Sequence, residues 1–195
     1  MTRSFKALLV ALVLATPILS SCSESIDPTS TVPAVQPQDG LVGDLLGGLL
    51  GLVGTIITGP DANGEDAEKW IGSGGGTVST AAYTLTVPAG AVSQSTRFRI
   101  EPTNTGTYSV DLSAHRKGGL LGLSLVEVGS KGFAKPVKLT VKYANATNVK
   151  DPSGLVIIYI RSDGTLELQT TVVDTTAKNV TSGLSHFSRY AMAQN

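Results

Sequence analysis

The stretch Val137-Lys138-Leu139-Thr140-Val141-Lys142-Tyr143 alternates apolar and polar side chains without interruption. Successive side chains of a β-strand point to opposite faces, so this pattern puts Val, Leu, Val and Tyr on one face and Lys, Thr and Lys on the other. The stretch predicts a strand with one buried face and one solvated face.

Similar strand-like runs recur along the chain after Trp70. Tyr83–Val87 and Arg97–Ile100 alternate in the same way, whereas Leu155–Ile160 is apolar throughout, as expected of a strand covered on both faces. Residues 161–164 (Arg-Ser-Asp-Gly) predict a hairpin turn into a strand at 165–168. Further short strands are expected at 107–112, 124–128, 170–173, 178–181 and 185–192.

No stretch after residue 70 keeps the 3.6-residue apolar period of a helix. About nine or ten short antiparallel strands separated by turn residues are typical of a sandwich. We therefore expect residues 70–195 to form an all-β domain, an antiparallel β-sandwich. The glycine-rich run 72–76 is expected to be a hinge at the start of that domain, and 115–119 a small solvated basic loop.

Composition excludes several function classes. The 195 residues carry 15 Lys and Arg against 15 Asp and Glu, so the chain lacks the basic excess of a nucleic-acid-binding surface. One cysteine cannot form an internal disulfide, and two histidines are too few for a multi-histidine metal site, although carboxylate ligands remain possible. We expect no cofactor, no metal and no nucleic-acid partner.

Residues 1–21 have the pattern of an export signal. Arg3 and Lys6 precede an apolar stretch that is too short to span a bilayer as a helix, and small residues follow it. Leu19-Ser20-Ser21-Cys22 resembles the lipobox of bacterial lipoproteins. That resemblance implies that Cys22 carries lipid, palmitate included, becomes the mature N-terminus and holds the protein at a membrane. The alternative is an ordinary cleaved signal with an incidental cysteine.

The expected location is therefore the bacterial cell envelope. Ser23 stands where an aspartate would suggest retention in the inner membrane, so we expect the outer membrane if the cell is Gram-negative.

Residues 22–69 are expected to be a tether. The first part is rich in Ser, Thr, Pro and Gln and has no apolar periodicity, and residues 59–69 are polar and acidic. Between them, 41–58 (LVGDLLGGLLGLVGTIIT) is strongly apolar and rich in glycine. Three interpretations stay open for this stretch: a low-complexity linker, a segment that lies on lipid or packs on the domain, and a transmembrane helix.

The domain resembles a known family at several points. Four stretches look like the ZU-five domain: Gly75-Gly76-Thr77-Val78, the run 83–92 (YTLTVPAGAV), 135–141 (KPVKLTV) and 186–191 (HFSRYA). The run 83–92 includes the Pro-x-Gly-Ala element of that family, Pro88-Ala89-Gly90-Ala91, and this element predicts a turn after the strand. This β-sandwich module occurs in ankyrins, zonula-occludens proteins and netrin receptors, and also in bacterial envelope proteins. Leu166 and Leu168 stand where a tryptophan is expected after the hairpin.

His186-Phe187-Ser188 is the candidate for chemistry. In some eukaryotic relatives a His-Phe-Ser tripeptide cleaves itself, which by resemblance would make His186 the base, Phe187 the donor of the scissile carbonyl and Ser188 the nucleophile. That reaction needs a strained peptide bond. A regular closing strand, with Phe187 and Ala191 in the core and His186 at its rim, explains the same residues without catalysis.

The leading hypothesis is a lipid-anchored, non-enzymatic envelope protein. Its sandwich would serve as an interaction or structural module for another envelope or surface protein. The alternative is a domain that cleaves itself between Phe187 and Ser188. A carbohydrate-binding sandwich is less favoured, because such sites stack sugars on exposed aromatic side chains and this domain has few.

Overall fold

The computed structural model describes residues 54–119 and 123–194. The expected signal at 1–21, Cys22 and the tether as far as residue 53 lie outside the described residues. The strands are β1 (Thr55–Ile56), β2 (Ala67–Ile71), β3 (Gly76–Ser79), β4 (Tyr83–Val87), β5 (Thr96–Pro102), β6 (Ser109–Gly118), β7 (Ser124–Glu127), β8 (Val137–Lys142), β9 (Leu155–Ile160), β10 (Leu166–Leu168), β11 (Thr171–Asp174), β12 (Asn179–Leu184) and β13 (Arg189–Gln194). Three short 3-10 helices lie between them: η1 (Pro60–Ala62), η2 (Gly129–Lys131) and η3 (Pro152–Gly154).

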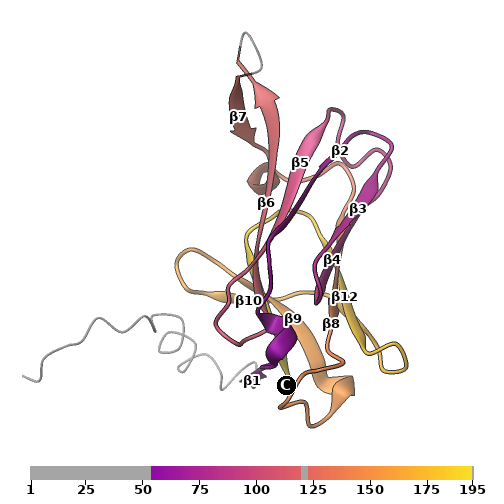
Figure 1. Cartoon of the computed structure of the whole chain (residues 1–195), viewed down its shortest axis with the longest axis vertical. Coiled ribbons are helices and arrows are strands. Elements are labelled where there is room, and N and C mark those ends of the chain that lie inside the picture. The colour runs from indigo at the N-terminus through magenta and orange to yellow at the C-terminus, as the bar shows by residue number, and fades with distance from the viewer. Residues whose placement is uncertain (1–53, 120–122, 195) are drawn as a thin grey trace, which may run out of the picture. The chain divides into compact units, whose positions relative to one another are not determined.

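The strands form two sheets packed face to face (Figure 1). The larger, eight-stranded sheet has the order β10-β9-β13-β6-β5-β2, with β1 paired to β13 and β7 paired to β6. The smaller, five-stranded sheet has the order β11-β12-β8-β4-β3. The neighbouring strands of both sheets run antiparallel. The expected all-β antiparallel sandwich is confirmed.

Strand β8 shows why the sequence forms this sandwich. Val137, Leu139 and Val141 are buried in the core between the sheets, and Lys138 and Lys142 are exposed on the outer face of the smaller sheet. Burying one such aliphatic side chain contributes about 1.5–3 kcal/mol relative to leaving it in water. The alternation therefore fixes which face of the strand turns inward.

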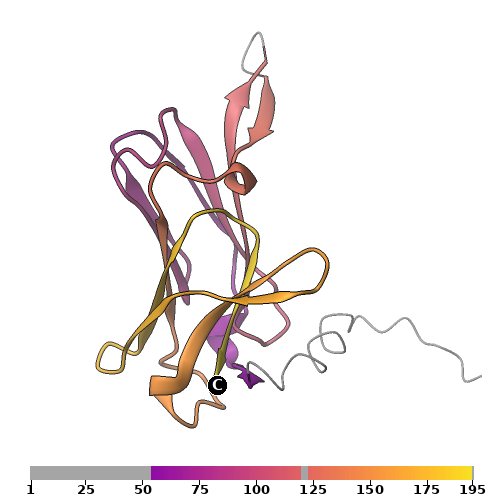
Figure 2. The ribbon, with the colours of Figure 1, turned by 180° about the vertical axis from the view of Figure 1, so that it is seen from behind.

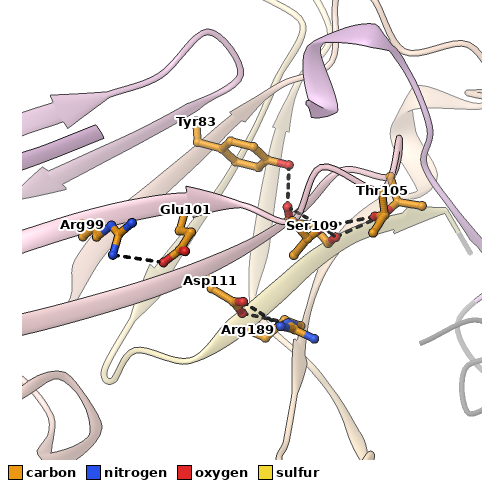
Figure 3. A network of polar contacts seen from close by, with 9 residues as sticks. Tyr83, Arg99, Glu101, Thr105, Ser109, Asp111 and Arg189 are labelled. Carbon is orange, nitrogen blue, oxygen red and sulfur yellow. Dashed lines mark hydrogen bonds and ion pairs between the residues drawn. The ribbon is translucent and has the colours of Figure 1, made fainter. Parts of the chain in front are cut away.

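On the larger sheet, the outer face of β5, β6 and β13 carries paired charged side chains (Figure 3). Arg99 pairs with Asp66 and lies 3.5 Å from Glu101. At the neighbouring strand pair, Arg189 Nε donates to Asp111 Oδ1 at 2.7 Å and Arg189 Nη2 donates to Asp111 Oδ2 at 2.6 Å. This bidentate pair joins β13 to β6 and raises the pKa of the Arg189 guanidinium.

The expected start of the folded domain at residue 70 is wrong. Ile57 and Ala62 are fully buried in the core, β1 pairs with β13, and β2 pairs with β5 over its whole length. Residues 59–69 looked like linker because η1 and its flanks are polar turns and because β2 is an edge strand, whose charged side chains face water.

The expected regular strand at 185–192 is also wrong. Strand β12 ends at Leu184 in the smaller sheet, β13 begins at Arg189 in the larger sheet, and residues 185–188 connect the two. Leu184, Phe187 and Tyr190 are all buried in the main core, which no single alternating strand allows. Phe187 is buried as expected, whereas Ala191 belongs to a separate apolar cluster on the outer face of the larger sheet.

The sequence predicted one glycine-containing turn correctly, the turn after β4, and misplaced another, the run 72–76. The expected turn after β4 is present: Gly90 has φ +80°, and the Ala91 amide donates to the Pro88 carbonyl at 3.1 Å. Residues 72–75 form a turn between β2 and β3 within the domain, and Gly76 begins β3, so the run 72–76 is not a hinge before the domain. In the part of the chain that the structure describes, no helix is both long and apolar enough to span a membrane.

Candidate functional site

The His186-Phe187-Ser188 segment lies where the chain crosses from one sheet to the other. Backbone hydrogen bonds fix it on both sides: the Phe187 amide donates to the Gly129 carbonyl at 2.9 Å, and the Leu112 amide donates to the Ser188 carbonyl at 2.9 Å. A Cβ at Gly129 would lie 3.0 Å from Phe187 Cβ, so the close approach of η2 to this segment depends on glycine.

The His186 side chain is turned toward two tyrosines. Its ring contacts the Tyr159 ring at a centroid distance of 4.8 Å, and its Nδ1 lies 3.4 Å from the Tyr190 hydroxyl. That hydroxyl donates to the His186 carbonyl at 2.8 Å, and burial raises its pKa. Between residues that the structure describes, no hydrogen bond joins the His186 ring to the Ser188 hydroxyl.

The connection between the sheets contains all three residues expected to take part in self-cleavage, but their side chains are not arranged for that reaction. Phe187 is locked in the core, His186 contacts the tyrosines, and none of the three residues has a positive φ. As found, the imidazole is not paired with the nucleophile that self-cleavage would need. The arrangement fits a connection held rigidly between the sheets.

Cys22, the expected lipidation site, lies outside the described residues. Within 54–119 and 123–194, no group of three or more His, Cys, Asp or Glu side chains is arranged to hold a metal ion. The acidic residues near the start of the domain are used in pairing instead: Asp66 pairs with Arg99, Glu68 lies 3.6 Å from Arg97, and Asp61 accepts from Asn145 at 2.8 Å.

A second candidate site lies on the β6–β7 hairpin, of which the sequence predicted β7 and the first part of β6 but not the extension of β6 to Gly118. Strands β6 and β7 pair from His115 opposite Glu127 to Gly118 opposite Ser124, and they extend beyond the rest of the sandwich as an arm (Figures 1 and 2). The basic residues at 115–117 therefore belong to a strand, not to the loop expected from sequence.

The outer face of this arm carries exposed apolar side chains. Lys117 lies directly opposite Leu125, and its Nζ is 5.6 Å from the centre of the Trp70 ring. The exposed fractions are 40 % for Trp70, 47 % for Leu125 and 86 % for Leu123, just before β7. We call Trp70, Lys117, Leu123 and Leu125 the arm surface. Trp70 and Lys117, together with Gln94 and Ser95, line a shallow cleft of about 370 Å³.

On the inner side of the arm, the gap between the sheets is open. A cavity of about 590 Å³ is lined by Arg116 of β6, Thr96 of β5, Phe133 and the turn around Gly90. The apolar and aromatic walls of this cavity, beside the Arg116 guanidinium, can bind an extended peptide or an apolar side chain of a partner.

Sequence patterning could have found part of the arm surface. The run 120–125 (Leu-Leu-Gly-Leu-Ser-Leu) is rich in leucine and directly follows Gly118-Gly119, and within it the structure shows Leu123 and Leu125 exposed. The position of Trp70 beside Lys117 depends on the pairing of β2, β5 and β6, which no local pattern encodes.

The comparisons with known proteins add no relative: no family model matches the chain, and no curated protein matches it.

Proposed function

We propose that the protein is a lipid-anchored bacterial envelope protein whose sandwich binds another envelope or surface protein without catalysing a reaction. The anchor is the lipid on Cys22, supported by Leu19-Ser20-Ser21-Cys22 after an apolar export signal. The sandwich is of the ZU-five type, a proposal supported by the sequence motifs and by the Pro88–Ala91 turn at the position of the family's Pro-x-Gly-Ala element.

The observation that carries the binding proposal is the arm surface. Of the five large hydrophobic side chains that are exposed among the described residues, Trp70, Leu123 and Leu125 gather at this one end of the sandwich. Exposed leucines cost solubility, and clustered apolar side chains around an indole and a cation are typical of protein-binding surfaces. Tryptophan is also among the residues that contribute most to binding energy.

The positions of the first described residues and of the C-terminal strand fit this role. The first described residues and the C-terminal strand lie together at the end of the sandwich opposite the arm (Figure 1). A protein anchored through residues that precede Gly54 would present the arm away from its own attachment point. The arm surface would then meet partners in the space beyond the membrane.

Radiolabelled palmitate tests the anchor. The wild-type protein should incorporate the label and fractionate with membranes, and Cys22→Ser should remove the label and release the protein into the soluble fraction. A Cys22→Ser variant that stays wholly in the membrane fraction would show that another segment anchors the chain.

Quantitative affinity capture from envelope extracts tests the binding surface. The chain carrying Leu123→Ser and Leu125→Ser should lose a partner that the wild type retains. Val172→Ser is the matched control, because Val172 is 68 % exposed but lies on β11 of the other sheet. Equal capture by all three proteins would refute the arm surface as the binding site.

Self-cleavage between Phe187 and Ser188 is the alternative function. Its support is the tripeptide itself, and His186, Phe187 and Ser188 would act as base, carbonyl donor and nucleophile. The contacts of His186 with Tyr159 and Tyr190 would have to break before the imidazole could serve Ser188.

A further inference from the structure

The larger sheet carries an apolar patch on the face that points away from the core. Strand pairing puts Ile56 beside Ala193 and Ala193 beside Val156; one row further, Ala191 lies beside Ile158. In the next row Ile160 pairs with Leu166. We call this set the outer apolar patch: Ile56, Val156, Ile158, Ile160, Leu166, Ala191 and Ala193.

The centre of the outer apolar patch is completely buried. Ile158 and Ala193 each have 0 % of their surface exposed, although their strand neighbours Ile157 and Met192 are the residues that face the main core. A side chain on a sheet stands roughly perpendicular to it, so neighbours in the same layer shield its flanks and leave its tip open. Full burial of Ile158 therefore calls for a layer above the sheet.

Strand β9 was expected from its sequence to be covered on both faces, and the patch is its second face. Leu155 and Ile157 pack in the main core, whereas Val156, Ile158 and Ile160 form the patch. If it were left in water, apolar surface of this kind would cost about 25 cal/mol per Å² relative to covered surface. A strand that is apolar on both faces is typical of a sheet with material on each side.

We propose that residues 41–53 of this chain lie across the outer apolar patch and cover it. Apart from glycines and Asp44, this segment consists of Leu and Val. The described chain begins at Gly54, and the third residue, Ile56, is already a member of the patch. The apolar segment thus enters the sandwich at the edge of the surface that it would cover.

The length of the segment suits the patch. Crossing from β1 over β13 and β9 to β10 takes three strand spacings, about 15 Å in all. Thirteen residues reach about 20 Å as a helix and roughly 40 Å when extended. Either conformation spans the patch, and the glycines allow a close approach to the small side chains of Ala191 and Ala193.

Covalent connection favours this occupant over a second copy or a lipid surface. A segment joined directly to the patch has an effective concentration in the millimolar range, whereas a second copy has no such connection. A lipid surface reached through an anchor on Cys22 is connected to the patch only by the longer stretch of chain from residue 22 onward, so its effective concentration at the patch is lower. The proposal does not depend on the function of the arm surface, which lies at the other end of the sandwich.

Thiol labelling tests the proposal in the full chain with Cys22→Ser, so that one added cysteine is the sole thiol. Leu166→Cys places it on the patch, and Val172→Cys places it on the other sheet as the control. The rate of maleimide labelling at position 166 should rise about tenfold or more when residues 41–53 are deleted, because a docked segment must open before the reagent enters. The rate at position 172 should stay the same.

Three results would overturn the proposal. Equal rates at position 166 with and without the segment would show that it covers nothing. Protection that grows with protein concentration would assign the patch to a second copy. Protection that requires added phosphatidylethanolamine–phosphatidylglycerol vesicles would assign it to a lipid surface.

A second measurement covers the case in which the deletion prevents folding. In the intact chain, Leu49→Cys combined with Leu166→Cys should form an intramolecular cross-link with a short bis-maleimide, whereas Leu49→Cys with Val172→Cys should not. Equal cross-linking of both pairs, or of neither, would contradict docking on the patch.

Discussion

The rings of Phe187 and Phe133 meet edge to face with their centroids 4.7 Å apart. Phe98 of β5 contacts both rings, each at a centroid distance of 5.8 Å. Phe187 belongs to the connection between the sheets, and Phe133 follows η2. This aromatic cluster therefore holds the crossing segment against the larger sheet.

Phe187→Ala should lower the free energy of unfolding by roughly 3–5 kcal/mol, because it removes a buried ring and leaves a cavity beside two others. Urea denaturation followed by circular dichroism measures the change. Val172→Ala is the control and should shift the stability by about 0.5 kcal/mol or less, since that side chain is mostly exposed. A loss below about 1 kcal/mol for Phe187→Ala would mean that the ring does not sit in the core.

The purified protein should remain one chain. Intact-mass spectrometry after denaturation is the required measurement, because a cleaved β13 could stay paired with β6 and β9 in native chromatography. Ser188→Ala should change the mass by one oxygen atom and nothing else. Detection of the fragment from Ser188 to Asn195 in the wild type, and its loss in Ser188→Ala, would establish self-cleavage instead.

The sequence predicted the central strands well because each of them alternates or is wholly apolar within its own residues. It failed at the two ends of the sandwich. Ile57 is a core residue inside a strongly apolar, glycine-rich stretch. Nothing in the local sequence distinguishes it from Ile56, which lies on the outer face of the larger sheet. Such assignments follow from long-range pairing with β13.

The candidate site was predicted only in part, for a similar reason. The His186-Phe187-Ser188 tripeptide is visible as a motif, but its position between two sheets is set by the partners of β12 and β13. A regular strand was the simplest interpretation of 185–192 because a crossing connection has no periodic signal. The arm surface joins Trp70 to Lys117 across three strands, so it is a property of the sheet order.

The folded domain needs residues that precede Trp70. A chain starting at Gly54 should fold cooperatively, whereas one starting at Trp70 lacks Ile57, Ala62 and most of β2, and should be far less stable or unfolded. Ile57→Ala in the full chain should by itself cost about 2–5 kcal/mol. Thermal unfolding of the three proteins compares them, and equal stability of the two truncated chains would contradict the structural role assigned to residues 54–69.

Alkaline pH should unfold the protein as its buried tyrosines ionise. Burial raises the pKa of Tyr108 to about 12 and also raises those of Tyr83 and Tyr190. A phenol whose pKa is higher in the folded state stabilises the fold fully below its unfolded pKa of about 10, and this contribution is lost as pH rises from there toward 12.

Phenolate absorbance and circular dichroism recorded on the same samples check this prediction. The phenolate signals of the buried tyrosines should appear together with the loss of β-sheet signal. Tyr108→Phe should remove one phenolate and keep the fold, because the Tyr108 hydroxyl has no hydrogen-bond partner among the described residues. Ionisation of all tyrosines near pH 10 in a folded protein would contradict their burial.

Photo-crosslinking in living cells tests the central claim, that an anchored sandwich binds a protein partner through its arm. A photoreactive amino acid replaces Leu125 in one strain and Val172 in another, both exposed positions but on different sheets. The account predicts a discrete adduct of one mass from position 125, lost when Trp70→Ala is added, and no such adduct from position 172. No adduct from position 125, or the same adduct from both positions, would contradict it.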